Sequence, residues 1–86
     1  MAQKIHLEIV TPERSILKDE VNEVVVPGLF GEFGVLPGHT TLLSELGSGR
    51  LTYTKGGESK SVVLTGGFAE VRDDQVTVMA DQAVSQ

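Results

Sequence analysis

The two histidines are the side chains of this 86-residue sequence best suited to acid–base or metal chemistry. Neither His6 nor His39 has neighbours at spacings that would supply the three protein ligands of a catalytic zinc site. A Ser/His/Asp arrangement can be written from Ser44, His39 and one of the 12 acidic residues, but so many acids make the match uninformative, and no G-x-S-x-G elbow is present. We therefore expect no metal site and no catalytic residue, and we interpret His39 as a turn or contact residue.

A glycine-rich stretch, "GLFGEFG", could in principle cradle a phosphate. Its glycines are spaced G-x-x-G-x-x-G, which is not the dinucleotide fingerprint, and no G-K-S or G-K-T brings a lysine to a phosphate. Both motifs also need a helix directly after the loop, whereas "VLPGH" follows here. We expect no nucleotide or other cofactor. The glycines are better explained as residues with positive φ angles, and as bulges, at a corner of a sheet.

The same stretch has the composition of a docking surface. Phe30 and Phe33 flank Glu32 in a turn, and loops on a rigid β scaffold often carry binding. At least one of the two phenylalanines should plug the end of the fold. The sequence does not indicate which of them faces outward.

The elements that would position these residues are strands, because apolar residues recur almost everywhere with a period of two. Alternation is clearest in three segments, Ile5 to Ile9, Leu51 to Thr54 and Val76 to Ala80, and a β-branched segment from Val21 to Val26 ends at Pro27 and Gly28. Gly56-Gly57 and Asp73-Asp74 are expected hairpin turns. Only "HTTLLSEL" could form a helical turn, and its threonines favour a strand equally. The fold class is therefore all-β, a small antiparallel β-sandwich that resembles a flattened barrel.

Composition limits the class of partner. The length fits one domain, residues 1–86, and the formal net charge is -5. An acidic chain with scattered Lys and Arg is a poor binder of nucleic acid, and a basic protein surface is the more natural partner. The amino terminus lacks the pattern of a signal peptide, and no apolar run approaches the roughly 20 residues of a transmembrane helix.

The order of the motifs is more specific than any one of them. The chain presents "IHLEIVTPE", "VNEVVVPG", a G-E-x-G-x-x-P-G-H run from Gly31 to His39, "TTLLSEL", "SGR", "LTGGFAEV" and "VTVMADQA". In this order they resemble the amino-terminal β-sandwich domain of the epsilon subunit of bacterial rotary ATP synthases. The resemblance covers essentially the whole chain.

The resemblance implies a non-catalytic subunit of the central stalk, part of the rotor. Such a domain binds the gamma subunit and rests on the ring of membrane-embedded c subunits. Through these two contacts it helps to couple proton transport through the ring to ATP synthesis. It implies a peripheral position at the cytoplasmic face of the bacterial inner (plasma) membrane, with no transmembrane segment of its own. The residues that match the ring-facing loop are Phe30, Gly31, Glu32, Phe33 and His39. The residues that fall where the domain would approach gamma are Thr11, Leu42 and Leu43.

One feature of the family is absent from these residues. Family members usually continue into a carboxy-terminal helical hairpin that brakes ATP hydrolysis and in some members binds ATP, whereas this sequence stops at "DQAVSQ". We expect a truncation at the domain boundary, and no inhibitory or ATP-binding role is assigned to these residues.

Two other functions remain as alternatives. The first is a free-standing β-sandwich that binds a small ligand in a cleft near His39, and the second is a small hydrolase that uses His39 and an acid. A rotor subunit predicts an exposed apolar patch on one face of the sandwich. A ligand-binding domain predicts a concave pocket with converging polar groups.

Overall fold

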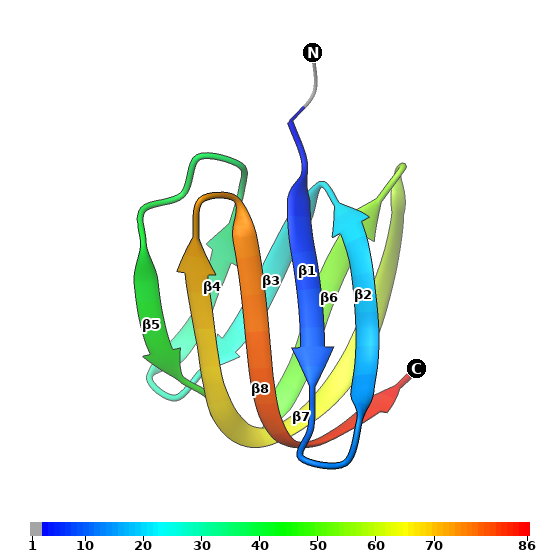
Figure 1. Cartoon of the computed structure of the whole chain (residues 1–86), viewed down its shortest axis with the longest axis vertical. Coiled ribbons are helices and arrows are strands. Elements are labelled where there is room, and N and C mark those ends of the chain that lie inside the picture. Colours follow the sequence, from blue (N-terminus) through cyan, green and yellow to red (C-terminus); the bar gives the residue numbers. More distant parts are fainter. Residues whose placement is uncertain (1–2) are drawn as a thin grey trace.

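The computed structural model describes residues 3–86, which fold into two packed layers of strands (Figure 1). The strands are connected by short turns, apart from one longer loop at residues 36–41. Their bounds are β1 Ile5–Val10, β2 Ser15–Val21, β3 Glu23–Gly28, β4 Gly31–Val35, β5 Leu42–Glu45, β6 Gly49–Lys55, β7 Glu58–Arg72 and β8 Gln75–Ser85.

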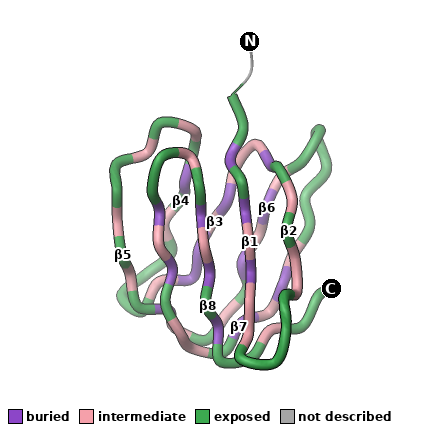
Figure 2. Tube along the Cα trace, viewed as in Figure 1, coloured by how far each residue is buried: buried purple, intermediate pink, exposed green. Residues whose placement is uncertain are grey.

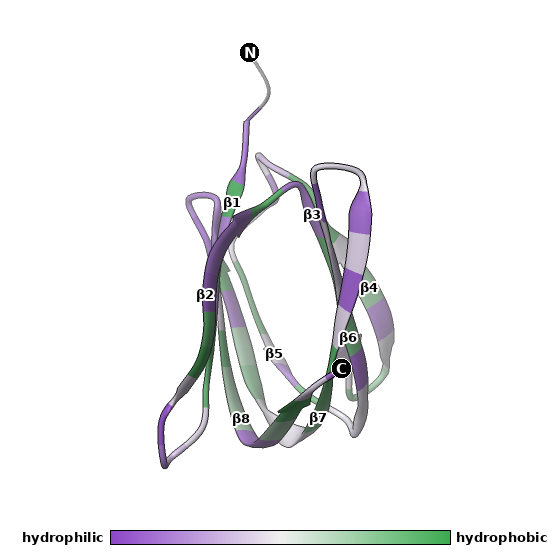
Figure 3. Cartoon of the chain, turned by 90° about the vertical axis from the view of Figure 1, so that its right-hand side faces the viewer, coloured by the Kyte–Doolittle hydropathy of each residue, from purple (hydrophilic) through white to green (hydrophobic). Residues whose placement is uncertain are grey.

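The two layers share the long hairpin β7–β8. The strands are hydrogen-bonded in the order β2-β1-β8-β7-β6-β3-β4, and β5 pairs with the second half of β7. Among the strand pairs formed by residues 3–86, only β1–β8 is parallel. We call β2, β1, the first half of β8, the second half of β7 and β5 the β1 layer. The β3 layer consists of β4, β3, β6 and the remaining halves of β7 and β8, and Figure 3 shows the two layers edge-on.

The hairpin passes from one layer to the other at a glycine corner. Gly66 and Gly67 have φ angles of 62° and 111°, in the region that favours glycine. A Cβ atom at Gly67 would lie 2.0 Å from the carbonyl oxygen of Met79. The β7 and β8 backbones therefore approach each other too closely for any side chain at this point.

The core lies between the layers and is made of the alternating residues that the sequence predicts. Ile5, Leu7 and Ile9 are at most 1% exposed, and Val76 and Val78 are fully buried. Figure 2 shows buried positions recurring along the strands of both layers, with exposed or half-buried positions between them. The all-β sandwich is thus confirmed, and both expected hairpin turns, at residues 56–57 and 73–74, are present.

The expected segment Val21 to Val26 differs from the structure at both ends, and the structure decides between the two forms left open for "HTTLLSEL". Val21 is the last residue of β2, and β3 begins at Glu23. β3 does not end before Pro27, because Pro27 and Gly28 still pair with Glu32 and Gly31 of β4. Proline lacks a backbone N–H, and it is tolerated at this position because the ladder needs no donor there. The carbonyl of Pro27 accepts a hydrogen bond from Gly47 N–H. The "HTTLLSEL" segment forms strand β5 and no helical turn, since it pairs with β7 over four residues.

An ion pair connects the two layers on the side where β2 is an edge strand. Both carboxylate oxygens of Asp19 on β2 lie 2.9 Å from Nζ of Lys55 at the end of β6. The hydrogen bond from Lys55 holds the pKa of Asp19 below its usual value, and the bond to Asp19 holds the pKa of Lys55 above its usual value. Next to this pair, Asn22 N–H donates to the carbonyl of Thr54 at 2.7 Å.

We expect Lys55→Met to lower stability slightly at neutral pH, because exposed pairs contribute little. The lowered pKa of Asp19 means that its contribution is present above the unfolded pKa of about 3.9 and is lost as pH falls through the folded value. The raised pKa of Lys55 means that its contribution is lost as pH rises through the folded value. Urea midpoints measured from pH 2 to 7 should therefore converge for wild type and variant at acid pH. Lys4→Met, at an exposed position, is the control, and a difference that persists unchanged at pH 2 would contradict this account.

Candidate interaction surfaces

The turn between β3 and β4 projects an aromatic side chain into solvent. Gly28 pairs with Gly31, so Leu29 and Phe30 form a two-residue connection at the lower left of Figure 1. Phe30 is 99% exposed and Leu29 is 46% exposed. Glu32, the next residue but one, is also exposed. The turn thus carries an apolar tip with one carboxylate beside it.

The second phenylalanine of this segment points the other way. Phe33 is half-buried and packs against the core. Its ring lies close beneath the turn, because a Cβ atom at Gly28 would be 3.1 Å from it and 2.7 Å from the carbonyl oxygen of Gly31. Phe33 is therefore the plug that the sequence predicts for one of the two aromatics, and Phe30 is the one that faces out.

His39 lies at the other end of β4, in the loop at the upper left of Figure 1. Its backbone N–H donates to the carbonyl of Leu36 at 3.2 Å, and its Nδ1 is 2.7 Å from the carbonyl oxygen of Thr40. The preceding Gly38 N–H donates to Oδ1 of Asp74 at 2.6 Å, which ties the loop to the β7–β8 turn. The length of β4 thus separates His39 from Phe30, so the predicted ring-facing residues do not form one patch.

Four apolar side chains gather on the outer face of the β1 layer. Met79 on β8 pairs with Phe68 on β7 and with Val10 on β1, so these three residues share one face. Leu43 on β5 is diagonal to Phe68, which pairs with Glu45. Leu43, Phe68 and Met79 are 66%, 49% and 44% exposed. We call Val10, Leu43, Phe68 and Met79 the outer apolar row.

Sequence reasoning found Leu43 but missed the other members of this row. The signal was present in "GGFAEV", where Phe68 is out of phase with the small and β-branched residues Ala69 and Val71. In a strand, an inward-facing Ala69 places Phe68 on the outer face. A large apolar residue in the solvent phase of an alternating strand is therefore the feature to look for.

The remaining residues predicted to face gamma lie around this row in different ways. Thr11 directly follows Val10, although its hydroxyl and N–H both donate to the carbonyl of Arg14 within the β1–β2 turn, at 3.3 and 2.9 Å. Leu42 packs against the core from β5. Of the two adjacent leucines, Leu43 is thus the one with an exposed side chain.

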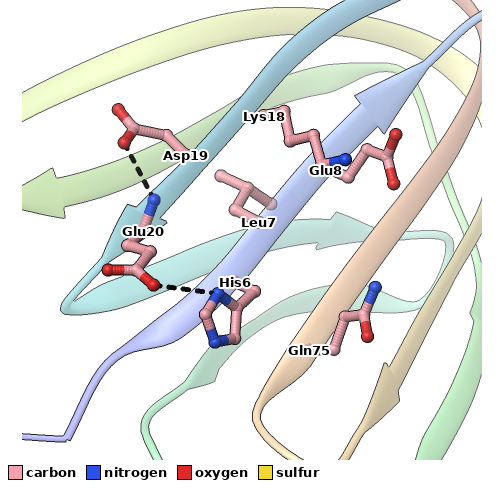
Figure 4. A pocket seen from close by; sticks show the side chains of 7 residues that line it. All are labelled: His6, Leu7, Glu8, Lys18, Asp19, Glu20 and Gln75. Carbon is pink, nitrogen blue, oxygen red and sulfur yellow. Dashed lines mark hydrogen bonds and ion pairs between the residues drawn. The ribbon is translucent and has the colours of Figure 1, made fainter.

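Three hollows on the surface of residues 3–86 are lined by residues other than His39. The first, between β1 and β2, has a volume of about 310 Å³ and is lined by His6, Leu7, Glu8, Lys18, Asp19, Glu20 and Gln75 (Figure 4). Two others, of about 250 and 290 Å³, are lined by residues from 70–77 and from 14–16 with 83–85. In the hollow between β1 and β2, His6 Nδ1 lies 3.3 Å from Oε2 of Glu20. No group of three His, Cys, Asp or Glu side chains in residues 3–86 is arranged to hold a metal ion.

Comparison with known families identifies the domain. Residues 4–86 match the family described as ATP synthase, Delta/Epsilon chain, beta-sandwich domain. The chain belongs to this family. The resemblance inferred from the order of the motifs is therefore confirmed, and the match covers every strand from β1 to β8.

Curated relatives of this ATP synthase delta/epsilon domain are named ATP synthase epsilon chain. Those of Nitratidesulfovibrio vulgaris (strain Miyazaki F) and Syntrophobacter fumaroxidans are 49% and 53% identical over 96% of this chain. The chain spans 62% of the length of both relatives.

Two solved structures share the fold of this domain. A chain in the Euglena gracilis mitochondrial ATP synthase complex of OSCP, F1 and c-ring matches 95% of this chain and 53% of its own length, at a TM-score of 0.90 and 32% identity. A chain in the central stalk and c-ring of the Tetrahymena thermophila mitochondrial ATP synthase matches 94% of this chain and 66% of its own length, at a TM-score of 0.78 and 18% identity. At this identity the match is evidence for the fold alone.

Proposed function

We propose that this domain is a non-catalytic part of the central stalk of a bacterial ATP synthase, where it binds the gamma subunit and the c ring. The outer apolar row is the observation that carries the proposal, since a rotor subunit needs an apolar face for a broad protein partner. Family membership and the epsilon-chain names of its relatives support the same function. The Euglena neighbour comes from a complex that includes the c-ring.

We assign the gamma contact to the outer face of the β1 layer. The outer apolar row crosses β1, β8, β7 and β5, with Thr11 beside one end and Leu43 at the other. Glu8, Glu45 and Glu70 lie on the same face next to the row, which favours a partner with basic residues at the rim. His39 is three residues before the start of β5, so it is better placed at the margin of this face than with Phe30.

We assign the ring contact to the β3–β4 turn. Phe30 is the apolar anchor, and Glu32 would pair with a cationic side chain on a ring loop. A rim ion pair contributes only about 0.2 to 1 kcal/mol, so Glu32 sets register while Phe30 supplies affinity. Gly31, with a φ angle of 136°, shapes the turn, and Phe33 supports it from the core side.

In this arrangement the domain bridges gamma and ring and helps rotation of the ring reach the catalytic head. It would lie at the cytoplasmic face of the membrane as a peripheral component. Within residues 3–86 the structure contains no helix with the length and hydropathy needed to cross a bilayer. The ligand-binding alternative gains no support from the structure, because His39 lines none of the three hollows described above.

We expect Leu43→Gln to weaken binding of purified gamma about tenfold, since full burial of a leucine side chain contributes about 1.5 to 3 kcal/mol and tenfold corresponds to about 1.4 kcal/mol. Val84→Gln is a matched control: Val84 is 64% exposed, against 66% for Leu43, but lies in the β3 layer. Calorimetric titration with gamma measures both, and circular dichroism verifies the fold. Equal affinities for Leu43→Gln and wild type would contradict the assigned face. A folded chain that does not bind gamma at all would contradict the proposed function.

A further inference from the structure

The turn that carries Phe30 is fastened to the β5 end by backbone hydrogen bonds across the two layers. Leu29 N–H donates to the carbonyl of Glu45 at 2.8 Å, and Gly47 N–H donates to the carbonyl of Pro27 at 3.0 Å. These bonds flank an antiparallel bridge between Gly28 and Leu46. We call this pairing of residues 27–29 with residues 45–47 the cross-strap.

The cross-strap is anchored to the core. Leu46 is 3% exposed, and its N–H donates to the carbonyl of Gly67 at the glycine corner, at 2.8 Å. In the other segment of the cross-strap, residues 27–29, Pro27 is buried. A movement of β5 relative to β3 would have to break these bonds or displace buried side chains. Both cost free energy, so the two segments should move as one unit.

The cross-strap is also the short route between the two proposed interfaces. Leu43, in the outer apolar row, is two residues from Glu45, and Phe30 is adjacent to Leu29. The covalent route from the turn to β5 is longer, because it follows β4 and then the loop of residues 36–41 at the far end of the molecule (Figure 1). Coupling between two sites travels through such packed and hydrogen-bonded connections.

We propose that the cross-strap couples the two surfaces, so that gamma bound at β5 restrains the Leu29–Phe30 turn for docking on the ring, with Gly47 as a positioning residue. This inference rests on the proposed function. Ordering the turn before the ring arrives removes part of the ordering cost of the second contact, which makes the two contacts cooperative without any change of fold.

Gly47 allows a matched pair of variants. In Gly47→Pro the N–H donor is lost, and the proline ring is directed at the carbonyl of Pro27. In Gly47→Ala the donor remains, and the added Cβ meets its nearest neighbour, the carbonyl oxygen of Gly28, at 3.5 Å, an ordinary contact. Leu46, which precedes the substitution, is in a β-bridge, the extended conformation that a following proline prefers.

The test is amide hydrogen exchange of this chain, free and bound to gamma. Exchange at Leu29 N–H should slow roughly tenfold on gamma binding, within the usual range of coupling between sites. Gly47→Ala should preserve this slowing, and Gly47→Pro should abolish it. The reference is Gly56 N–H, which donates to Oδ1 of Asn22 at 3.0 Å in the turn that follows β6 and should not respond.

The outcomes separate the inference from the proposed function. Unchanged exchange at Leu29 with gamma bound would overturn the coupling and leave the gamma assignment intact. Slowing that persists in Gly47→Pro would show that gamma covers the turn directly, which also overturns the coupling. Absence of gamma binding by the folded wild-type chain would overturn both. If Gly47→Pro fails to fold, the wild-type comparison still tests the coupling, because unchanged exchange at Leu29 with gamma bound would overturn it.

Discussion

Replacing Gly67 with alanine should destabilise the domain by more than about 3 kcal/mol, a large part of the stability expected for 86 residues. The added Cβ would lie 2.0 Å from the carbonyl oxygen of Met79 and 2.8 Å from the Cα of Ala80. Both neighbours are backbone atoms of β8 and cannot turn away. The φ angle of 111° adds strain for any residue with a Cβ. The only relief is to separate β7 from β8, which opens the corner where the layers join.

Two other glycines separate the steric effect from the conformational one. Gly57 has a φ angle of 85°, but a Cβ atom there would have no heavy-atom neighbour within 4 Å, so Gly57→Ala should cost only about 1 to 2 kcal/mol. Gly34 has no positive φ, and its nearest neighbour would be Oε2 of Glu23 at 3.9 Å, so Gly34→Ala should be near neutral. Urea unfolding of the three variants should rank them in this order. A Gly67→Ala domain as stable as Gly57→Ala would refute the close approach at the corner.

Much of the fold could be predicted because strands such as β1, β6 and β8 alternate buried with less buried residues. Ile5, Leu7 and Ile9 must face the same way in an extended chain, and all three lie in the core. The turns at residues 56–57 and 73–74 were equally readable, since glycine and aspartate tolerate the positive φ angles found there. Local chemistry determines these features, so local sequence reveals them.

The features that were not predicted depend on contacts between distant segments. Strand β2, Ser15–Val21, has no clean alternation because it lies at an edge and carries charges such as Asp19, whose partner is Lys55 on β6. Pro27 ended the expected strand, but it stays in the β3–β4 ladder opposite Glu32, and its carbonyl is satisfied by the distant N–H of Gly47. Neither pairing has a signal in the local sequence, because the partners are many residues away.

The candidate interaction surfaces likewise combine features that local sequence predicts with features that depend on distant contacts. The turn with Phe30 and Glu32 was found from composition, but its orientation depends on the core beneath it, which the sequence does not describe. Phe33 is drawn inward because it lies between Gly28 and the core, leaving Phe30 as the exposed aromatic. The outer apolar row is formed by residues on four strands, and only the register of those strands brings them together.

Replacing Phe30 with aspartate should weaken docking on the c ring by roughly thirtyfold, or about 2 kcal/mol, while leaving the domain as stable as wild type. A side chain that is 99% exposed contributes almost nothing to the fold, so its substitution reports on the partner alone. Proton pumping driven by ATP hydrolysis in reassembled complexes should fall accordingly. The same change at Phe33 is not equivalent, because Phe33 packs against the core, and Phe33→Asp would place a carboxylate in an apolar contact and lower stability.

The comparison of these variants separates docking from folding. Phe33→Asp should lower the urea midpoint and lose coupling only as a consequence, whereas Phe30→Asp should lose coupling at an unchanged midpoint. Glu32→Gln should have a mild effect that vanishes at high salt, since an exposed ion pair is screened and an apolar anchor is not. Intact pumping with Phe30→Asp would remove the turn from the ring interface. Because Phe30 and Glu32 lie on one turn, such a result would also leave Glu32 without an apolar contact to orient it, and the ring would have to bind another part of the domain.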